Sequence, residues 1–143
     1  GILDLHDREI AGWSMSNRQT SDIVVNALVM ALARRRPDGD VIHHADRGSQ
    51  YTSGDLALTM TDHHVSASFG DTGVCWDNAT MESTWATIKR EIRHIHGDWE
   101  TMTRSQLRTV LFDYIETFYN RSRHQARLGH HTPAEAYAAS QAA

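Results

Sequence analysis

The spacing of apolar residues predicts alternating strands and helices in the first half of the chain. Residues 2–5 are a short apolar start and residues 9–15 alternate in polarity, so together they predict a hairpin. Apolar residues then recur at helical spacing from Ile23 to Arg36, after a capping Thr20 or Ser21. Short apolar runs at 41–45 and 65–69 predict two more strands, separated by a helix from Asp55 to His64.

The second half of the chain is predicted to be helical. Asp77 or Asn78 can cap a helix from about Ala79 to His96, and Thr103 can cap a second long helix. Thr132 begins a capping box that also places proline at the first helical position. This order of elements indicates an α/β domain with a mixed sheet. We expect a core over residues 1–97, and a C-terminal helical extension of the same domain over residues 98–143.

Composition places the chain among ordinary globular proteins. It has 143 residues, of which 40% are hydrophobic and 22% are charged. No apolar run approaches the roughly 18 residues that a membrane span requires. The single cysteine, Cys75, cannot form an internal disulfide, which favours a cytoplasmic location.

The net charge of −4 argues against an obvious nucleic-acid binder, but the charges are unevenly distributed. Residues 1–81 carry six arginines against eleven acidic residues. Residues 82–143 carry eight basic residues against seven acidic ones, and the basic residues lie between 89 and 127. The acidic first region would suit a cation, whereas the basic residues of the chain are concentrated in the second region.

Two carboxylates and a lysine suggest a site for a phosphodiester. Asp46 follows a predicted strand, where ligands gather in open α/β sheets, and Glu82 lies in the first turn of a predicted helix. Lys89 is seven residues further on, within about 20° of the same helix face and about 10 Å along its axis. Carboxylate oxygens suit Mg²⁺. By residue type alone, each position also fits an ordinary role as turn residue, helix-dipole partner or solvated lysine.

Three blocks of sequence carry a resemblance to a known family. Residues 43–51 read H-H-A-D-R-G-S-Q-Y, residues 75–83 read C-W-D-N-A-T-M-E-S, and residues 119–135 contain Y-N-R, L-G and T-P-A-E. These blocks resemble bacterial insertion-sequence transposases of the OrfB type, which belong to the DDE class and share the retroviral-integrase catalytic core. Thirty-five residues separate Asp46 from Glu82, the spacing of the D-35-E signature, and Lys89 matches the basic residue of that family.

The resemblance implies an RNase H-like fold and metal-dependent phosphoryl transfer on DNA, as in DNA integration and transposition. Asp46 and Glu82 would be catalytic residues that hold Mg²⁺ or Mn²⁺. His44 would be a structural neighbour of Asp46, and Asn78 would cap the helix that carries Glu82. Residues expected to contact DNA are Lys89, Arg90, Arg93, Arg121 and Arg123. Expected partners are transposon-end and target DNA, a second copy of the chain or a full-length transposase, in a nucleoid-associated cytoplasmic location.

One departure from the family pattern concerns the first catalytic aspartate. In the family it lies on the first strand, upstream of a hairpin that Asp4 and residues 8–13 resemble, so we expect an incomplete triad here. Asp4 and Asp7 match non-catalytic hairpin positions. The main alternative is therefore an inactive remnant that only binds DNA or a transposase partner, and a metal-dependent nuclease is a third reading. Trp76, Trp85 and Trp99 are expected to pack in the core or on helices rather than to stack on bases.

Overall fold

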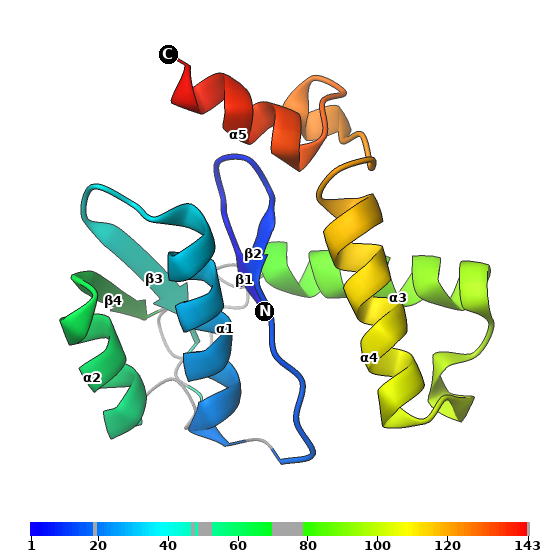
Figure 1. Cartoon of the computed structure of the whole chain (residues 1–143), viewed down its shortest axis with the longest axis horizontal. Helices are drawn as coiled ribbons and strands as arrows, with labels where there is room; N and C mark the ends of the chain where they lie inside the picture. The colour runs from blue at the N-terminus through cyan, green and yellow to red at the C-terminus, as the bar shows by residue number, and fades with distance from the viewer. Residues whose placement is uncertain (19, 47, 49–52, 70–78, 143) are drawn as a thin grey trace. The chain divides into compact units, whose positions relative to one another are not determined.

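The computed structural model describes residues 1–18, 20–46, 48, 53–69 and 79–142, and it confirms the predicted α/β class (Figure 1). Thr20 is the N-cap of the first helix, and Thr103 and Thr132 are the caps of two later ones, as predicted. The elements are β1 Ile2–Leu3, β2 Ile10–Gly12, α1 Ser21–Arg35, β3 Val41–Ala45, α2 Gly54–Asp62, β4 Val65–Phe69, α3 Ala79–His96, η1 Trp99–Thr101, α4 Arg104–Asp113, η2 Tyr114–Tyr119, η3 Ala126–Leu128 and α5 Pro133–Gln141.

The described chain divides into two compact units. The first comprises residues 1–2 and 11–83, and the second comprises residues 3–10 and 84–143. Among the described residues, β1 pairs with β2 and β3 pairs with β4, each as a two-stranded sheet. The domain boundary expected at residue 98 stays a prediction. None of the helices in the described ranges is long and apolar enough to cross a membrane.

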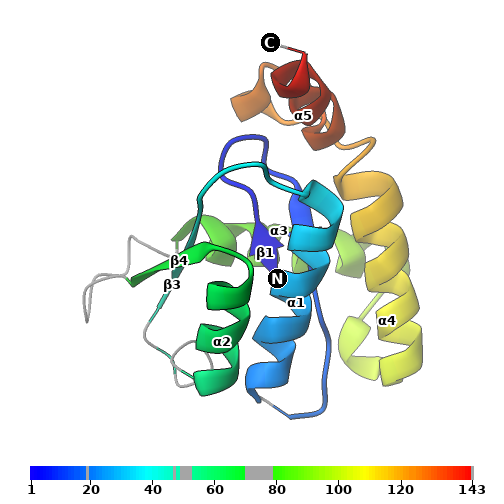
Figure 2. The same cartoon turned by 60° about the vertical axis from the view of Figure 1, so that its left-hand side comes forward.

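A small apolar core organises the first unit. β3 and β4 are parallel, with Val41 opposite Val65 and Ala45 opposite Phe69. Helices α1 and α2 lie side by side (Figures 1 and 2), and α2 also contacts β4. The core consists of side chains that recur at helical spacing on α1 and α2 and at the start of β4: Val24, Leu28, Leu56, Met60 and Val65. The periodicity of the sequence thus predicted the buried face of α1; on α2, Leu56 and Met60 are buried, whereas Leu58 is 66% exposed because it lies on another face of the helix.

Gly12 allows strand β2 to approach helix α1 closely. A Cβ atom at this position would lie 2.0 Å from the carbonyl oxygen of Ala27 and 2.7 Å from the amide nitrogen of Ala31. Both atoms belong to the helix backbone and cannot move aside as a flexible side chain would. The strand is shorter than the alternating pattern of residues 9–15 suggested, and it ends at this glycine.

The second unit is mainly helical. It contains α3 from Thr84 onward, α4, and a turn of π-helix, η2, that continues α4. The polar side chain of Asn120, only 3% exposed, joins two distant segments of this unit. The Ile10 N–H donates to Asn120 Oδ1 at 3.0 Å, and Asn120 Nδ2 donates to the Ile10 carbonyl at 3.2 Å. The Asn120 carbonyl in turn accepts from the Ala134 N–H at 2.9 Å, at the start of α5.

Candidate functional site

Asp46 lies immediately after β3, at the carboxyl end of the parallel pair, as the sequence predicted. Its side chain is exposed, and its Oδ1 atom accepts a hydrogen bond from the Gly48 N–H at 2.9 Å. This hydrogen bond restrains the carboxylate of Asp46. Because a carboxylate has about four acceptor positions, it leaves further acceptor positions for a ligand.

Two adjacent histidines of β3 precede this aspartate. His43 is buried, and burial lowers its pKa below the ordinary value of 6.5, with a further contribution from neighbouring His44. The Nδ1 atom of His44 lies 3.0 Å from the Ser68 hydroxyl on β4. His44 thus ties the two strands together one residue before each strand ends, which supports the structural role predicted for it.

Glu82 lies in the first turn of α3 and is exposed. It belongs to the same compact unit as Asp46. Asn78, the predicted cap of this helix, lies outside the described residues.

The donor chemistry of Asp46 and Glu82 suits a hard divalent cation, because both supply carboxylate oxygens. Among the described residues, however, no group of three or more histidine, cysteine, aspartate or glutamate side chains is placed to hold a metal ion. Integrase and DDE transposase cores as a class use divalent metal ions. The assignment of Asp46 and Glu82 as metal ligands stays a prediction.

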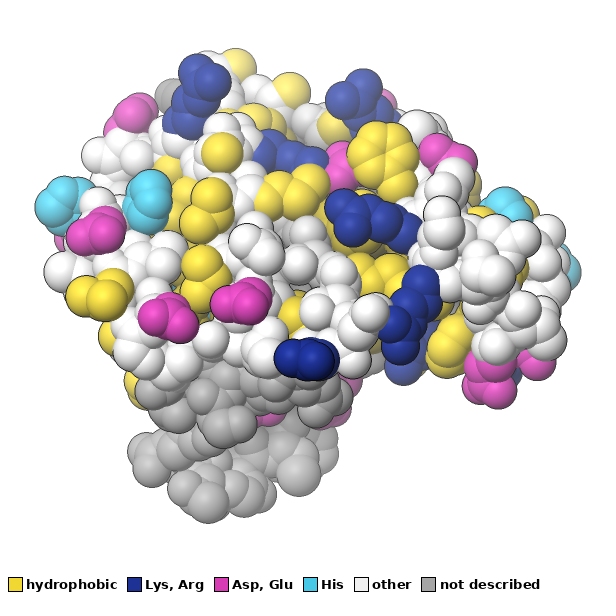
Figure 3. Space-filling model, turned by 60° about the horizontal axis from the view of Figure 1, so that its bottom comes forward, with side chains coloured by type: hydrophobic (Ala, Val, Ile, Leu, Met, Phe, Trp, Pro, Cys, Tyr) yellow, Lys and Arg dark blue, Asp and Glu magenta, His cyan; other side chains and the backbone are white. Residues whose placement is uncertain are grey.

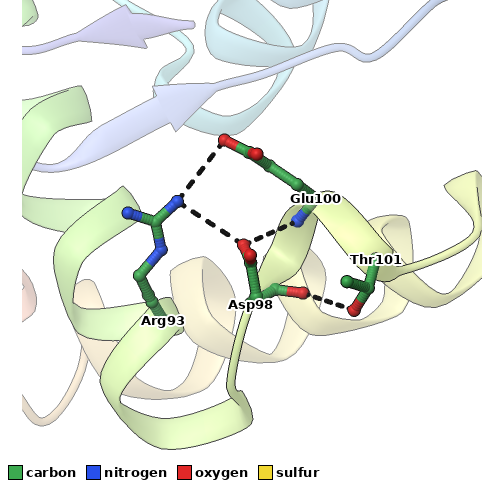
Figure 4. A network of polar contacts seen from close by, with 4 residues as sticks. All are labelled: Arg93, Asp98, Glu100 and Thr101. Atoms are coloured by element: carbon green, nitrogen blue, oxygen red, sulfur yellow. Dashed lines mark hydrogen bonds and ion pairs between the residues drawn. The ribbon is translucent and has the colours of Figure 1, made fainter.

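Lys89 and Arg93 project from the later part of α3 toward the ring of Trp99. Lys89 Nζ and Arg93 Cζ each lie 5.8 Å from the centroid of this ring. The Arg93 guanidinium also forms ion pairs with Asp98 at 3.5 Å and Glu100 at 3.4 Å (Figure 4). The sequence analysis placed Trp99 among packing residues and gave no sign of its contact with Lys89, since the two lie ten positions apart in different elements.

Arg123 makes the best-defined ion pair of the second unit. Its Nη2 atom lies 2.7 Å from Glu91 Oε1, and its Nε atom lies 3.1 Å from both carboxylate oxygens. The Tyr114 hydroxyl donates to Glu91 Oε2 at 2.6 Å. Both charged side chains are only about a quarter exposed. The role predicted for Arg123 in DNA binding stays a prediction, and the structure adds that its guanidinium is already engaged.

The pKa values of these three groups reflect their mutual contacts. Burial alone would raise the pKa of Glu91, but hydrogen bonds from Arg123 and Tyr114 outweigh it and lower that pKa below 4.5. Burial, together with the hydrogen bond to Glu91, raises the pKa of Tyr114. The hydrogen bond to Glu91 raises the pKa of Arg123. The network is thus a charged pair with a neutral tyrosine at neutral pH.

The remaining predicted DNA contacts, Arg90 and Arg121, are exposed. The surface view shows lysine and arginine side chains beside hydrophobic ones on the face that it draws (Figure 3). Of the basic residues predicted to contact DNA, Lys89, Arg90, Arg93 and Arg121 are exposed and Arg123 is half-buried; Arg93 and Arg123 also pair with carboxylates.

The chain is similar in sequence to a known family and to several known proteins. Two family models, both described as integrase core domain, match residues 1–75 and 63–133. The insertion element IS600 uncharacterized 31 kDa protein of Shigella sonnei is 40% identical over 135 residues, which is 94% of this chain and 48% of that protein. Transposase InsF for insertion sequence IS3A of Escherichia coli K12 is 40% identical over 132 residues, covering 92% and 45% respectively. The chain thus spans about half the length of these relatives.

Solved structures confirm the fold. The catalytic core domain of BIV integrase is similar with a TM-score of 0.63 and 17% identity, over 94% of this chain and 83% of that one. A chain of the simian T-cell lymphotropic virus intasome in complex with PP2A regulatory subunit B56 gamma has a TM-score of 0.68 and 15% identity, over 87% and 42%. The expected RNase H-like class and the resemblance to insertion-sequence transposases are both confirmed: the chain belongs to the integrase core domain family.

Proposed function

We propose that this chain is a catalytic-core fragment of a DDE transposase, a class of enzyme that transfers phosphoryl groups on DNA during transposition, and that it carries two of the three catalytic carboxylates. The observation that carries the proposal is the placement of Asp46 and Glu82. Within an integrase core fold, Asp46 follows the parallel strand β3 and Glu82 lies in the first turn of helix α3, with thirty-five residues between the two. The 40% identity to an insertion-sequence transposase supports transposon-end and target DNA as the substrates.

The two carboxylates have a defined task in this proposal. Asp46 and Glu82 would hold Mg²⁺ or Mn²⁺ through their oxygens, with Asp46 kept in place by the Gly48 N–H. When bound, such ions activate the attacking hydroxyl and stabilise the leaving oxygen in an in-line displacement. His44 supports Asp46 indirectly, because its bond to Ser68 fixes the end of β3 against β4.

The basic residues supply the contacts with DNA. Lys89 lies on the same helix as Glu82, two turns later, and is exposed. Its ammonium group would bind a DNA phosphate near the transposon end, and Arg90 and Arg121 would add further phosphate contacts. Such contacts fix the position of the duplex without selecting its sequence. Self-association and nucleoid association belong to the same proposal.

Calorimetric titration with Mn²⁺ tests the two-carboxylate assignment. Binding heat is expected for the wild-type chain and is expected to fall sharply for Asp46→Asn and Glu82→Gln. Asp62→Asn is a matched control, because it removes the same charge from an exposed position at the end of α2, in the same unit. Equal heats for wild type and Asp46→Asn would remove the metal-site assignment.

A further inference from the structure

We propose that Trp99 is a positioning residue that holds the Lys89 ammonium in place to contact a DNA phosphate. The inference rests on the proposed function, since it concerns the same phosphate contact. It assigns a role to a side chain that comes from η1, outside the helix that carries Glu82 and Lys89.

After α3 the backbone turns back toward the helix at Gly97, which adopts a left-handed conformation. Gly97 has φ +83°, and its N–H donates to the Arg93 carbonyl at 3.0 Å, which closes the last turn of the helix. Asp98 then caps η1, with its Oδ1 atom accepting from the Glu100 N–H at 3.2 Å. The Asp98 carbonyl accepts from the Thr101 hydroxyl at 2.7 Å (Figure 4). This turn is fixed at several points, so the position of Trp99 is also fixed.

The ring of Trp99 attracts two cations of α3. Lys89 Nζ and Arg93 Cζ are each 5.8 Å from its centroid, within the range of about 6 Å over which a cation interacts with an aromatic ring. Lys89 and Arg93 are four residues apart and therefore lie on one helix face. A lysine side chain has four rotatable bonds, and a contact near its end restricts them. Trp99 therefore reduces the entropy that Lys89 loses on binding a phosphate.

The two carboxylates that follow α3, Asp98 and Glu100, pair with Arg93 and give it surroundings that differ from those of Lys89. The Arg93 guanidinium lies 3.5 Å from Asp98 and 3.4 Å from Glu100, so it already has two carboxylate partners. In the part of the chain that the structure describes, no carboxylate lies within ion-pair distance of Lys89. Lys89 is thus the cation of this cluster that is available to an anion, and Arg93 helps to fix the turn. This division of roles differs from the prediction that both residues contact DNA.

A double-mutant cycle measures the coupling between Trp99 and Lys89. Affinity for a short fluorescently labelled DNA duplex is measured at several salt concentrations for wild type, Trp99→Leu, Lys89→Gln and the double variant of the 143-residue chain. Trp99→Leu should weaken binding by about two- to fivefold in the wild-type background and leave affinity unchanged in the Lys89→Gln background. Lys89→Gln should lower the log–log salt slope by about 0.9.

Two further variants separate positioning from general damage to the fold. Trp99→Phe keeps an aromatic face and should retain most of the affinity that Trp99→Leu loses. Arg108→Gln removes one positive charge from an exposed position on α4 and should show no coupling to Trp99→Leu. Far-ultraviolet circular dichroism and thermal unfolding define the temperature range in which each variant is folded, and binding is compared within that range.

The outcomes distinguish failure of this inference from failure of the proposed function. Unchanged affinity and salt slope in Lys89→Gln would contradict the phosphate contact itself, and with it this part of the proposed function. In a second outcome, Lys89→Gln lowers the affinity and the salt slope as expected, but Trp99→Leu lowers the affinity by the same factor with and without Lys89. This outcome would mean that Trp99 stacks on DNA or acts through the fold. That second result would overturn the positioning role and leave the proposed function standing.

Discussion

At the scale of single residues, Asn120 shows how one buried side chain can join distant segments. Its amide group reproduces the hydrogen bonds of a neighbouring strand, since it both accepts from and donates to the backbone of Ile10. An amide is suited to this task because it carries a donor and an acceptor side by side. A carboxylate of the same shape could accept from the N–H but could not donate to the carbonyl.

We expect Asn120→Ala to lower the free energy of unfolding by about 2–3 kcal/mol, because two buried hydrogen bonds are lost and a small cavity is created. Asn120→Asp should also destabilise the chain, since it places a negative charge beside the Ile10 carbonyl. Asn26→Ala, at an exposed position of α1, is the control and should change stability by less than about 0.5 kcal/mol. Urea denaturation measures all three, and an Asn120→Ala midpoint equal to wild type would contradict the assigned role.

At the scale of elements, helix α3 has one buried face and one exposed face. Thr84, Ile88 and Ile92 recur at helical spacing and are buried, whereas Glu82 and Lys89 are exposed. Glu91 lies beside the buried face and binds Arg123 and Tyr114. Tyr114 and Tyr119, at the two ends of the π-helical turn η2, are both buried, with ring centroids 6.3 Å apart. Because this turn forms i to i+5 hydrogen bonds, it brings residues five apart onto nearly the same face.

The contacts of Glu91 predict a dependence of stability on pH. The pKa of Glu91 is lowered below 4.5 in the folded chain, so its contribution is fully present above pH 4.5 and is lost as the pH falls through the folded-state pKa. The Glu91→Gln variant should therefore be less stable than wild type at pH 7, and the difference should shrink below pH 4.5. Denaturation midpoints measured at pH 7, 5, 4 and 3 would show this; a difference that stays constant over this range would contradict it.

Arg123 provides the complementary test of this network. An Arg123→Lys substitution keeps the charge but cannot reproduce the forked contact with Glu91, so it should recover only part of the stability that Arg123→Gln loses. Since both partners are about a quarter exposed, solvent screening limits the whole effect to about 1–2 kcal/mol.

At the scale of the whole molecule, the distribution of charge bears on the proposed interaction with DNA. The net charge is −4, yet residues 82–143 carry a small excess of basic residues. We expect binding to a DNA duplex to weaken steeply as salt rises and to differ little between unrelated sequences, because phosphate contacts release counterions whatever the base sequence. Fluorescence anisotropy with two unrelated duplexes would measure this, and affinity that stays constant between low and moderate salt would rule it out.

The sequence by itself determined the elements and the positions of the candidate ligands. Caps at Thr103 and Thr132 act within three residues, so each helix start could be predicted from its neighbours alone. Strands β3 and β4 were predicted at their observed bounds, because a short apolar run flanked by polar residues is also a local signal. The blocks at residues 43–51 and 75–83, together with the spacing of Asp46 and Glu82, carried the resemblance to the family before any geometry was available.

Only the tertiary structure decided which distant side chains meet. The Arg123 contact with Glu91 joins residues 32 positions apart, and the contact of Asn120 with Ile10 joins residues 110 apart. Periodicity shows which face of an element is buried, but it does not show which partner covers it. In the same way, Gly97 and Asp98 marked a turn in the sequence, whereas its direction, which carries Trp99 back over Lys89, depends on backbone geometry. The roles of Trp99 and Arg123 therefore became visible only once the chain was folded.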